Sequence, residues 1–485
     1  MRLRVRFAER GLTPSDLAGA TVAIVGIGRE GQAVARMLER DVPTATLLAL
    51  DQADGEHASV WRASFDIPLH IATGEQDAAS GVLSSGIDIA VVSPGIPPRN
   101  PLLRALQAAD VTITSGTDLF FSLNHERIIG VTGSKGKSTT SAVVHHLLRA
   151  HGVDAVLGGN VGVPLWDLPE ATWVVAEVSS YQATGLHFSP HTAVLTALFE
   201  EHIDWHGSFE AYATDKLNLV GHGPTHVVVN TTQQTLMTEL TARYSNLPLI
   251  TVGEGSAWHI ERVDDRAFIA HHDQQLIALD ALPVVGEHNA WNVLLALAAV
   301  ETVITLDPSV IADALASFHP LPHRMQPVSD PSGVRFINDS LATNPPALAA
   351  ALRSLRSERV IALVGGRDRG VDDESLRQEL VEHPPAALIG LPDSGPDLLR
   401  KVRGWLTDAG VDQGRWPRLE VAADMDDAVA AARTIAGPGD VVTLSPGAPS
   451  FGRYRDYQER AEDFIRAVEH TAPHGTHERT PPHGA

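Results

Sequence analysis

The sequence lacks cysteine altogether in its 485 residues. Disulfides, a cysteine nucleophile and a zinc site built on thiolates are therefore excluded. Long apolar runs are missing as well, since the best apolar helix candidate, residues 290–300, is too short to span a bilayer. The first six residues have no apolar core of the kind that secretion signals carry. We therefore expect a soluble, cytoplasmic protein that inserts into no membrane.

Positive charge is scarce too. Lysine and arginine number 37 against 59 aspartate and glutamate residues, which leaves a net charge of −22. A surface of this sign repels a phosphate backbone, so we predict that nucleic acid is not a partner. The hydrophobic content of 44% is that of a folded chain, and the length exceeds what one core can organise, so we expect several domains.

Three successive blocks each alternate short β-branched runs with amphipathic stretches rich in alanine and leucine. This alternation predicts α/β domains with parallel sheets. We place the blocks at residues 1–122, 123–320 and 321–470. The expected strands include residues 21–25, 45–50, 87–92, 127–131, 173–178, 360–364, 387–389 and 441–444, and a helix is expected near residues 289–300. Residues 471–485 are rich in proline, histidine and glycine, which predicts a disordered tail.

The most informative motif is a glycine-rich loop, residues 133–138, between an apolar run and a helical pattern. Glycines let backbone N–H groups turn toward a phosphate, and Lys137 adds a mobile charge. Ser138 would place its hydroxyl on a bound Mg²⁺. A strict P-loop has glycine where this chain has Val131, so the motif predicts a nucleoside triphosphate site of a divergent kind. A chance occurrence of the motif is the alternative.

A second glycine motif, residues 26–31, follows the first expected strand and reads G-x-G-x-x-G. Asp51 lies 20 residues after Gly31, as in dinucleotide-binding folds. An NAD-dependent oxidoreductase is therefore one hypothesis. A UDP-linked substrate at the same helix N-terminus is the other. Ser93 and Gly95 end the neighbouring strand, where open α/β sheets bind ligands.

The middle block holds candidate metal ligands. Glu177 ends the expected strand 173–178, where a carboxylate can coordinate Mg²⁺ directly or through water; a capping or buried paired acid is the alternative. His202 lies in a polar cluster at residues 200–208, which indicates either a metal ligand or a surface loop. Lys216 has the spacing of an ordinary solvated helical lysine.

Taken together, these residues resemble the muramyl (Mur) ligases of peptidoglycan synthesis, in the branch that adds glutamate. The resemblance spans nearly the whole chain and rests on residues 132–139, 158–162, 177–180, 201–202, 216, 288–292, 322–324 and 338–340. It implies three domains: a Rossmann-like N-terminal domain, a P-loop ATPase-like central domain with a parallel sheet, and a Rossmann-like C-terminal domain. It also implies a monomer.

The resemblance implies a reaction as well. ATP phosphorylates the carboxylate of UDP-N-acetylmuramoyl-L-alanine, and the amine of glutamate attacks the acyl phosphate. The residues implied to be catalytic are Lys137, Lys216 and His202. Those implied to bind ATP are Gly133, Ser134, Lys135, Gly136, Lys137, Ser138, Thr139, Asn289, Arg324 and Asp339. Two Mg²⁺ ions would be held by Ser138, Glu177, His202 and Lys216, the last as a carbamate.

Substrate residues follow from the same resemblance. The UDP-linked substrate would contact Gly28, Arg29, Glu30, Asp51, Ser93, Gly95, Asn160 and Gln182. Glutamate would contact Thr343, Arg369, Ser450, Phe451 and Tyr457. Arg369 is placed to clamp a carboxylate in a bidentate manner.

Two stretches depart from the family pattern. Leu341 stands where the family has lysine, and residues 449–454 differ from the usual amino-acid segment. Both changes resemble a subgroup that adds L-glutamate, whereas D-glutamate is the family default. Folate polyglutamate ligases share the middle block, but the first block argues against them. A non-enzymatic nucleotide switch would leave Arg324, Asp339 and Arg369 without a role.

Overall fold

The computed structural model describes residues 7–72, 77–78, 86–283, 287–318, 323–367, 373–450 and 452–472. The chain divides into two compact units, Met1–His319 and Pro320–Ala485. Almost all of the predicted disordered tail, together with Arg369 and Phe451, lies outside the described residues. Within the part of the chain that is described, no helix is long and apolar enough to cross a membrane.

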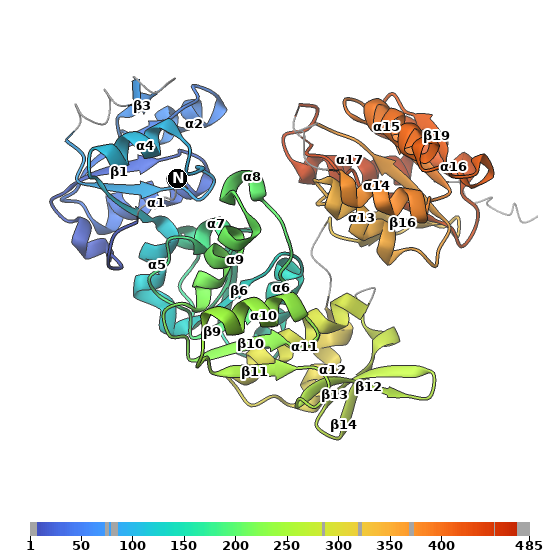
Figure 1. Cartoon of the computed structure of the whole chain (residues 1–485), viewed down its shortest axis with the longest axis horizontal. Helices are drawn as coiled ribbons and strands as arrows, with labels where there is room; N and C mark the ends of the chain where they lie inside the picture. The colour runs from blue at the N-terminus through green and yellow to red at the C-terminus, as the bar shows by residue number, and fades with distance from the viewer. Residues whose placement is uncertain are drawn as a thin grey trace, which may run out of the picture. The chain divides into compact units, whose positions relative to one another are not determined.

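The first unit begins with a five-stranded parallel sheet in the order β3-β2-β1-β4-β5 (Figure 1). Its strands are β1 (Thr21–Val25), β2 (Thr46–Asp51), β3 (Leu69–Ile71), β4 (Ile89–Val92) and β5 (Thr112–Ser115). Its helices are α1 (Arg29–Asp41), α2 (Glu56–Ser64), α4 (Pro101–Ala108) and α5 (Gly116–Asn124). The strand order reverses between β1 and β4, and such switch points are where Rossmann-like sheets bind nucleotides.

The same unit continues into a nine-stranded sheet in the order β14-β13-β12-β11-β10-β9-β6-β8-β7. Its first six strands are β6 (Ile128–Thr132), β7 (Ala155–Gly159), β8 (Trp173–Glu177), β9 (Thr192–Leu195), β10 (His226–Asn230) and β11 (Leu249–Val252). All of these pair in parallel. The helices are α6 (Lys137–Ala150), α7 (Ser180–Ala183), α8 (Ile203–His206), α9 (Phe209–Leu217), α10 (Gln234–Arg243), α11 (Glu287–Glu301) and α12 (Pro308–Ser317).

An antiparallel arm extends this parallel sheet, which the alternating pattern had not indicated (Figure 1). It consists of β12 (Trp258–Val263), β13 (Arg266–His271) and β14 (Gln274–Ala278). Two-residue loops join these strands, and Asp264 and His272, the first residues of the two loops, have φ near 52°. Short loops with positive φ match the twist of antiparallel strands, so the hairpins form locally.

The second unit holds a six-stranded sheet in the order β15-β16-β20-β17-β18-β19, parallel except for β15. Its strands are β15 (Gln326–Val328), β16 (Arg335–Asn338), β17 (Val360–Val364), β18 (Ala387–Gly390), β19 (Arg418–Val421) and β20 (Val441–Leu444). Its helices are α13 (Pro345–Ser354), α14 (Glu374–Glu382), α15 (Gly395–Asp408), α16 (Met425–Ile435) and α17 (Tyr457–His470).

The cores confirm the predicted α/β class with three domains. Strands β6 and β17 are buried along their whole length, because helices cover both faces of a parallel sheet. The strands predicted from apolar runs appear within two residues of their expected ends. The exact domain boundaries remain predictions.

Candidate functional site

The phosphate loop joins the buried strand β6 to the N-terminus of α6, as predicted. Gly136 precedes the helix with φ of 87°, a conformation that side chains rarely adopt. A Cβ on Gly133 would lie 1.9 Å from Thr196 Oγ1, and one on Gly136 would lie 2.4 Å from Asn292 Oδ1. Both positions therefore require glycine, and the loop keeps its backbone in a shape fit for phosphate.

Three lysines surround this loop. Lys137 Nζ donates hydrogen bonds to the carbonyl oxygens of Gly133 (2.8 Å) and Ser134 (3.3 Å). Lys216 Nζ donates to the same Gly133 carbonyl at 3.0 Å, and Lys135 Nζ lies 2.5 Å from Glu201 Oε1. Lysine side chains gathered beside a helix N-terminus can donate hydrogen bonds to a polyphosphate. Ser138 and Thr139 follow in the first turn of α6, with Ser138 buried.

Lys216 is not the solvated lysine that its spacing alone indicated. Its side chain is buried in the last turn of α9, with only 3% of the residue exposed, and Nζ lies 5.0 Å from the centroid of the Tyr212 ring. Burial, together with the charge of Lys137, lowers the pKa of Lys216 well below its usual value. The structure therefore favours the neutral, nucleophilic amine.

Glu177 ends β8 as a buried carboxylate, as the sequence predicts. Its Oε1 accepts a hydrogen bond from Asn160 Nδ2 at 2.7 Å, and its carbonyl accepts one from Asn160 N at 2.9 Å. The backbone at Gly159 lies close to that of Glu177, because a Cβ on Gly159 would be 2.4 Å from the Glu177 carbonyl oxygen. Asn160, predicted to contact the muramyl substrate, is therefore also the residue that orients Glu177.

His202 precedes α8 in the left-handed conformation, with φ of 56°, and its ring centroid lies 5.1 Å from that of Tyr181. Partial withdrawal from water lowers the pKa of His202, and the charges of Lys216 and Lys137 lower it further despite Glu201 nearby. The neutral imidazole that results is the form that binds metals.

Among the described residues, no group of three histidine, cysteine or acidic side chains is arranged to hold a metal. Glu177 and His202 supply only two such donors.

A histidine network that the sequence did not reveal joins the elements around this cluster. The His206 side chain is fully buried; its Nδ1 lies 2.6 Å from Asp215 Oδ2, and its Nε2 lies 3.0 Å from Ser180 Oγ. These contacts tie α8 to α9, which carries Lys216, and to α7, which follows Glu177. No motif signals this role, because it depends on long-range contacts.

The first glycine loop has a largely internal hydrogen-bond pattern. A Cβ on Gly31 would lie 1.9 Å from the Gly26 carbonyl oxygen, so α1 packs directly on the loop. Asp51 is predicted to contact the UDP-linked substrate. Its carboxylate accepts hydrogen bonds from the backbone N–H groups of Ile27 (3.0 Å), Gln52 and Ala53. Ser93 Oγ donates to the Gly26 carbonyl at 2.8 Å. Gly28 caps α1 and Gly95 is exposed, both with open space around them.

Residues of α1 contact a part of the central domain that includes Gln182, which is predicted to contact the muramyl substrate. Gln182 Nε2 donates to Glu30 Oε1 at 3.3 Å, and Arg29 Nη2 donates to the Gly162 carbonyl. Burial raises the pKa of Glu30 to about 7, with Asp167 adding to the effect and Arg29 opposing it. The predicted contacts of the UDP end and of the muramyl end are thus brought together within one unit.

The predicted ATP residues fall in both units. In the first, Asn289 Oδ1 accepts a hydrogen bond from Asn292 Nδ2 at 3.0 Å, and Asn292 abuts Gly136 of the phosphate loop. In the second, Asp339 is buried after β16 and accepts hydrogen bonds from Ser445 Oγ (2.8 Å) and Met325 N (3.2 Å).

Burial raises the pKa of Asp339 to about 6, although these hydrogen bonds and the charge of Arg324 oppose the shift. A buried carboxylate stays ionised only if hydrogen-bond donors or cations surround it. We therefore expect a ligand that binds near Arg324 and Asp339 to be polar.

The residues that are predicted to contact the glutamate substrate, as far as the structure describes them, lie at one edge of the sheet of the second unit. Thr343 follows β16 and Ser450 follows β20, and the two loops are joined by a 2.8 Å hydrogen bond from Gly447 N to the Ala342 carbonyl. Tyr457 starts α17, and its carbonyl accepts a hydrogen bond from Ser340 Oγ at 2.8 Å. The structure thus brings Thr343, Ser450 and Tyr457 to neighbouring loops.

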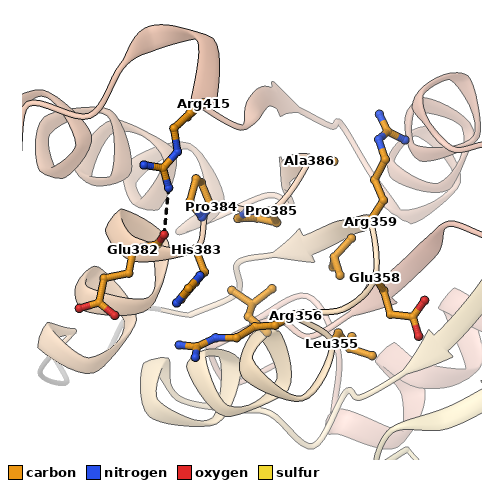
Figure 2. Close-up of a pocket in the computed structure, with 12 residues that line it drawn as sticks. Leu355, Arg356, Glu358, Arg359, Glu382, His383, Pro384, Pro385, Ala386 and Arg415 are labelled. Carbon is orange, nitrogen blue, oxygen red and sulfur yellow. Dashed lines mark hydrogen bonds between the residues drawn. The ribbon is translucent and has the colours of Figure 1, made fainter.

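A hollow of about 440 Å³ in the second unit lies away from these residues, at the start of β17 and β18 (Figure 2). Its arginines have partners: Glu379 for Arg356, Asp440 for Arg359 and the Glu382 carbonyl for Arg415, the last bond being the dashed line in Figure 2. Ligands of parallel sheets bind at the carboxyl ends of the strands. We therefore do not assign this hollow to the reaction.

Comparison with known proteins identifies the family. Residues 131–300 match the Mur ligase middle domain, and residues 323–447 match the Mur ligase glutamate ligase domain. A protein of Micromonospora sp. named UDP-N-acetylmuramoyl-L-alanine–L-glutamate ligase is 40% identical over 95% of this chain and 99% of its own. A protein of the same name from Xanthomonas euvesicatoria is 37% identical over 93% and 96%.

Solved structures agree on the fold. The UDP-N-acetylmuramate-alanine ligase MurC of Thermotoga maritima superposes with a TM-score of 0.57 at 17% identity, covering 93% of this chain and 99% of that one. MurF of the same organism, in complex with ADP, gives a TM-score of 0.55 at 15% identity, covering 97% and 100%. The chain therefore belongs to the Mur ligase family of ATP-dependent ligases.

Proposed function

We propose that this chain joins L-glutamate to UDP-N-acetylmuramoyl-L-alanine at the expense of ATP in peptidoglycan synthesis. The observation that carries the proposal is 40% identity, over 95% of the chain, to a ligase named for that reaction. The sequence left D-glutamate as the default and L-glutamate as the alternative, and the names of the relatives favour the alternative. An oxidoreductase built on residues 26–31 has no such support.

The proposed reaction begins when the terminal carboxylate of the nucleotide sugar attacks the γ-phosphorus of ATP, which gives an acyl phosphate and releases ADP. The glutamate amine then attacks the acyl carbon, loses a proton, and phosphate leaves from the tetrahedral intermediate. Phosphoryl transfer depends on positioning and on charge stabilisation. The N–H groups of residues 133–138 and Lys137 Nζ suit that task, because Lys137 already lies across the mouth of the loop.

Mg²⁺ fits the donors present. Ser138 and Glu177 would hold one ion, and His202 and Lys216 would take part in holding a second. The bound cations would offset the repulsion between the two anionic substrates. Asn160 would keep the Glu177 carboxylate in place through its 2.7 Å hydrogen bond.

Lys216 is proposed to react with CO₂. Its neutral amine would attack the carbon of CO₂, forming an N–C bond and releasing a proton, so that a cation becomes a carbamate anion. The burial of Lys216 and its lowered pKa support this step, since only the free amine is a nucleophile. The carbamate anion would also be attracted by the positive charge of Lys137 nearby.

The remaining residue assignments are part of the same proposal. Arg29, Glu30 and Gln182 would contact the nucleotide sugar, and Thr343 and Ser450 would contact glutamate. Leu341 occupies the position of the family lysine, and its N–H donates to the His323 carbonyl at 3.0 Å. The apolar Leu341 removes a positive charge near the residues that would contact the glutamate substrate. This change is in line with a preference for L-glutamate. We further propose a cytoplasmic monomer.

Phosphate release tests the reaction class. We expect release only when ATP, Mg²⁺, UDP-N-acetylmuramoyl-L-alanine and glutamate are all present, and loss of release in Lys137→Ala. Arg149→Ala is the matched control, because Arg149 is an exposed cation on the same helix. Equal phosphate release without the amino acid would refute the proposal.

A further inference from the structure

A second buried basic side chain, Arg460, has no role in the proposed reaction. It lies in the first turn of α17 with only 1% of the residue exposed. Its Nε donates to Ser340 Oγ (3.0 Å), its Nη2 to the Ser340 carbonyl (2.8 Å) and its Nη1 to the Ala448 carbonyl (2.9 Å). One side chain therefore binds two loops that are more than 100 residues apart in the sequence.

The charge of Arg460 is unusual for its surroundings. Within the described residues, it forms no ion pair with a carboxylate. Burial lowers its pKa to about 10, so the guanidinium remains charged at neutral pH. A buried charge is costly unless its hydrogen bonds are satisfied, and here neutral oxygens of two loops satisfy it. The arrangement is therefore maintained by the position of those loops.

The two loops carry predicted ligand-binding residues. The loop after β16 contains Asp339, assigned to ATP, and Thr343, assigned to glutamate, while the loop after β20 contains Ser450. Strands β16 and β20 are parallel neighbours, so both loops leave the same edge of the sheet. Ser445 Oγ also binds Asp339 across them at 2.8 Å.

A third loop meets the same guanidinium. A Cβ on Gly366, after β17, would lie 3.1 Å from Arg460 Nη1 and 2.4 Å from the Pro449 carbonyl oxygen. The backbone N–H of Arg367 donates to that carbonyl at 2.8 Å. Three loops thus converge on Arg460, and the small Gly366 is what lets the third one approach.

We propose that Arg460 is a positioning residue that fixes the amino-acid-binding loops and, through Ser340, the loop that carries Asp339. It acts without touching a substrate, by locking the backbone at Ser340 and Ala448. The proposal rests on the proposed function, because it assigns these loops to glutamate and ATP.

Kinetics provide the first test. In Arg460→Met we expect the KM for L-glutamate to rise about tenfold, because misplaced binding groups lose affinity steeply. The KM for ATP rises less, and the KM for the nucleotide sugar, assigned to the first unit, stays unchanged. A uniform fall in kcat with all three KM values unchanged would show a merely structural role and would overturn the proposal.

Arg433 provides the matched control. It is also an arginine of the second unit, with 14% of its side chain exposed, and it also binds α17, through the Val468 carbonyl at 2.9 Å. Unlike Arg460, it pairs with a carboxylate, since its Nη2 lies 2.6 Å from Asp330 Oδ1. Arg433→Met is expected to lower stability while leaving every KM unchanged.

Hydrogen exchange separates this inference from the proposed function. The milder pair Arg460→Lys and Arg433→Lys is compared with the wild type, without substrates. We expect faster exchange in residues 339–343 and 445–450 of Arg460→Lys alone. If both variants or neither show it, the positioning role is wrong, whatever the wild type catalyses. If the wild type releases no phosphate with either glutamate, the proposed function fails, while this result still stands.

Discussion

Lys216 in the central domain and Arg460 in the C-terminal domain are both buried basic side chains, with 3% and 1% of the residue exposed. Lys216 Nζ donates to one carbonyl oxygen, and burial lowers its pKa far below the usual value. Arg460 donates to three oxygens and keeps a pKa of about 10. The same burial thus produces a group able to react in one domain and a permanent charge that fixes loops in the other.

The largest expected effect separates the two side chains directly. In Lys216→Arg a permanent buried charge replaces the neutral amine and no nucleophilic amine can form, so we expect kcat to fall by about a thousandfold, as when one essential electrostatic group is removed. The kcat of Lys216→Ala is expected to fall equally, but to recover partly when a short carboxylic acid is added that replaces the carbamate. Initial rates of phosphate release measure both. Near-normal activity of Lys216→Arg would rule out the carbamate.

The next effect is on stability. Arg433→Met removes one partner of a buried ion pair and leaves Asp330 unpaired, so we expect the free energy of unfolding to fall by about 3 kcal/mol. Urea unfolding followed by tryptophan fluorescence gives the value. A loss of this size without any change in KM would show that a paired buried arginine serves the fold alone. A raised KM for glutamate would remove the contrast with Arg460.

A smaller effect is expected when Arg460 is replaced by lysine, which gives this site a buried amine like that of Lys216. A lysine at position 460 can lose its proton when buried, so Arg460→Lys is expected to lose the cation as the pH rises. We expect its KM for L-glutamate to rise about threefold between pH 7 and pH 9, while the wild type changes little. A pH series of KM values tests this. Parallel profiles for the two proteins would contradict it.

The smallest effect concerns a buried acid, Glu30, whose pKa is raised to about 7. A carboxyl whose folded pKa is raised destabilises the fold increasingly as the pH climbs from its unfolded pKa to its folded pKa. The full shift corresponds to about 3 kcal/mol above pH 7. Solvent screening of the partly exposed carboxyl reduces it, so Glu30→Gln is expected to be more stable than the wild type by about 1 kcal/mol at pH 8, and by little at pH 4.5. Thermal unfolding at both pH values would reveal the difference, and a constant difference would refute the shift.

Much of the fold could be predicted, because fully apolar runs bounded by glycine mark buried parallel strands. The runs at residues 21–25 and 360–364 became β1 and β17. The phosphate loop could be predicted equally well, because its glycines and lysines follow one another between a strand and a helix. The contacts of Thr196 and Asn292 that exclude a side chain at Gly133 and Gly136 are seen only in the fold.

The buried charges could not be predicted from sequence pattern. Lys216 and Arg460 sit at helical positions where a cation is ordinarily solvated, and only long-range contacts reveal their burial. Asp51 similarly matched a ribose-binding acid by spacing, yet its carboxylate accepts three backbone N–H groups of its own domain. The role of Arg369 and Phe451 remains a prediction from resemblance.

The most direct measurement compares the two enantiomers of glutamate with the wild-type enzyme, ATP, Mg²⁺ and UDP-N-acetylmuramoyl-L-alanine. The product is identified by mass and by chiral analysis after hydrolysis. We predict that kcat/KM for L-glutamate exceeds that for D-glutamate by at least about a hundredfold, as a pocket built on polar contacts allows. Equal values, or a preference for D-glutamate, would contradict the assignment.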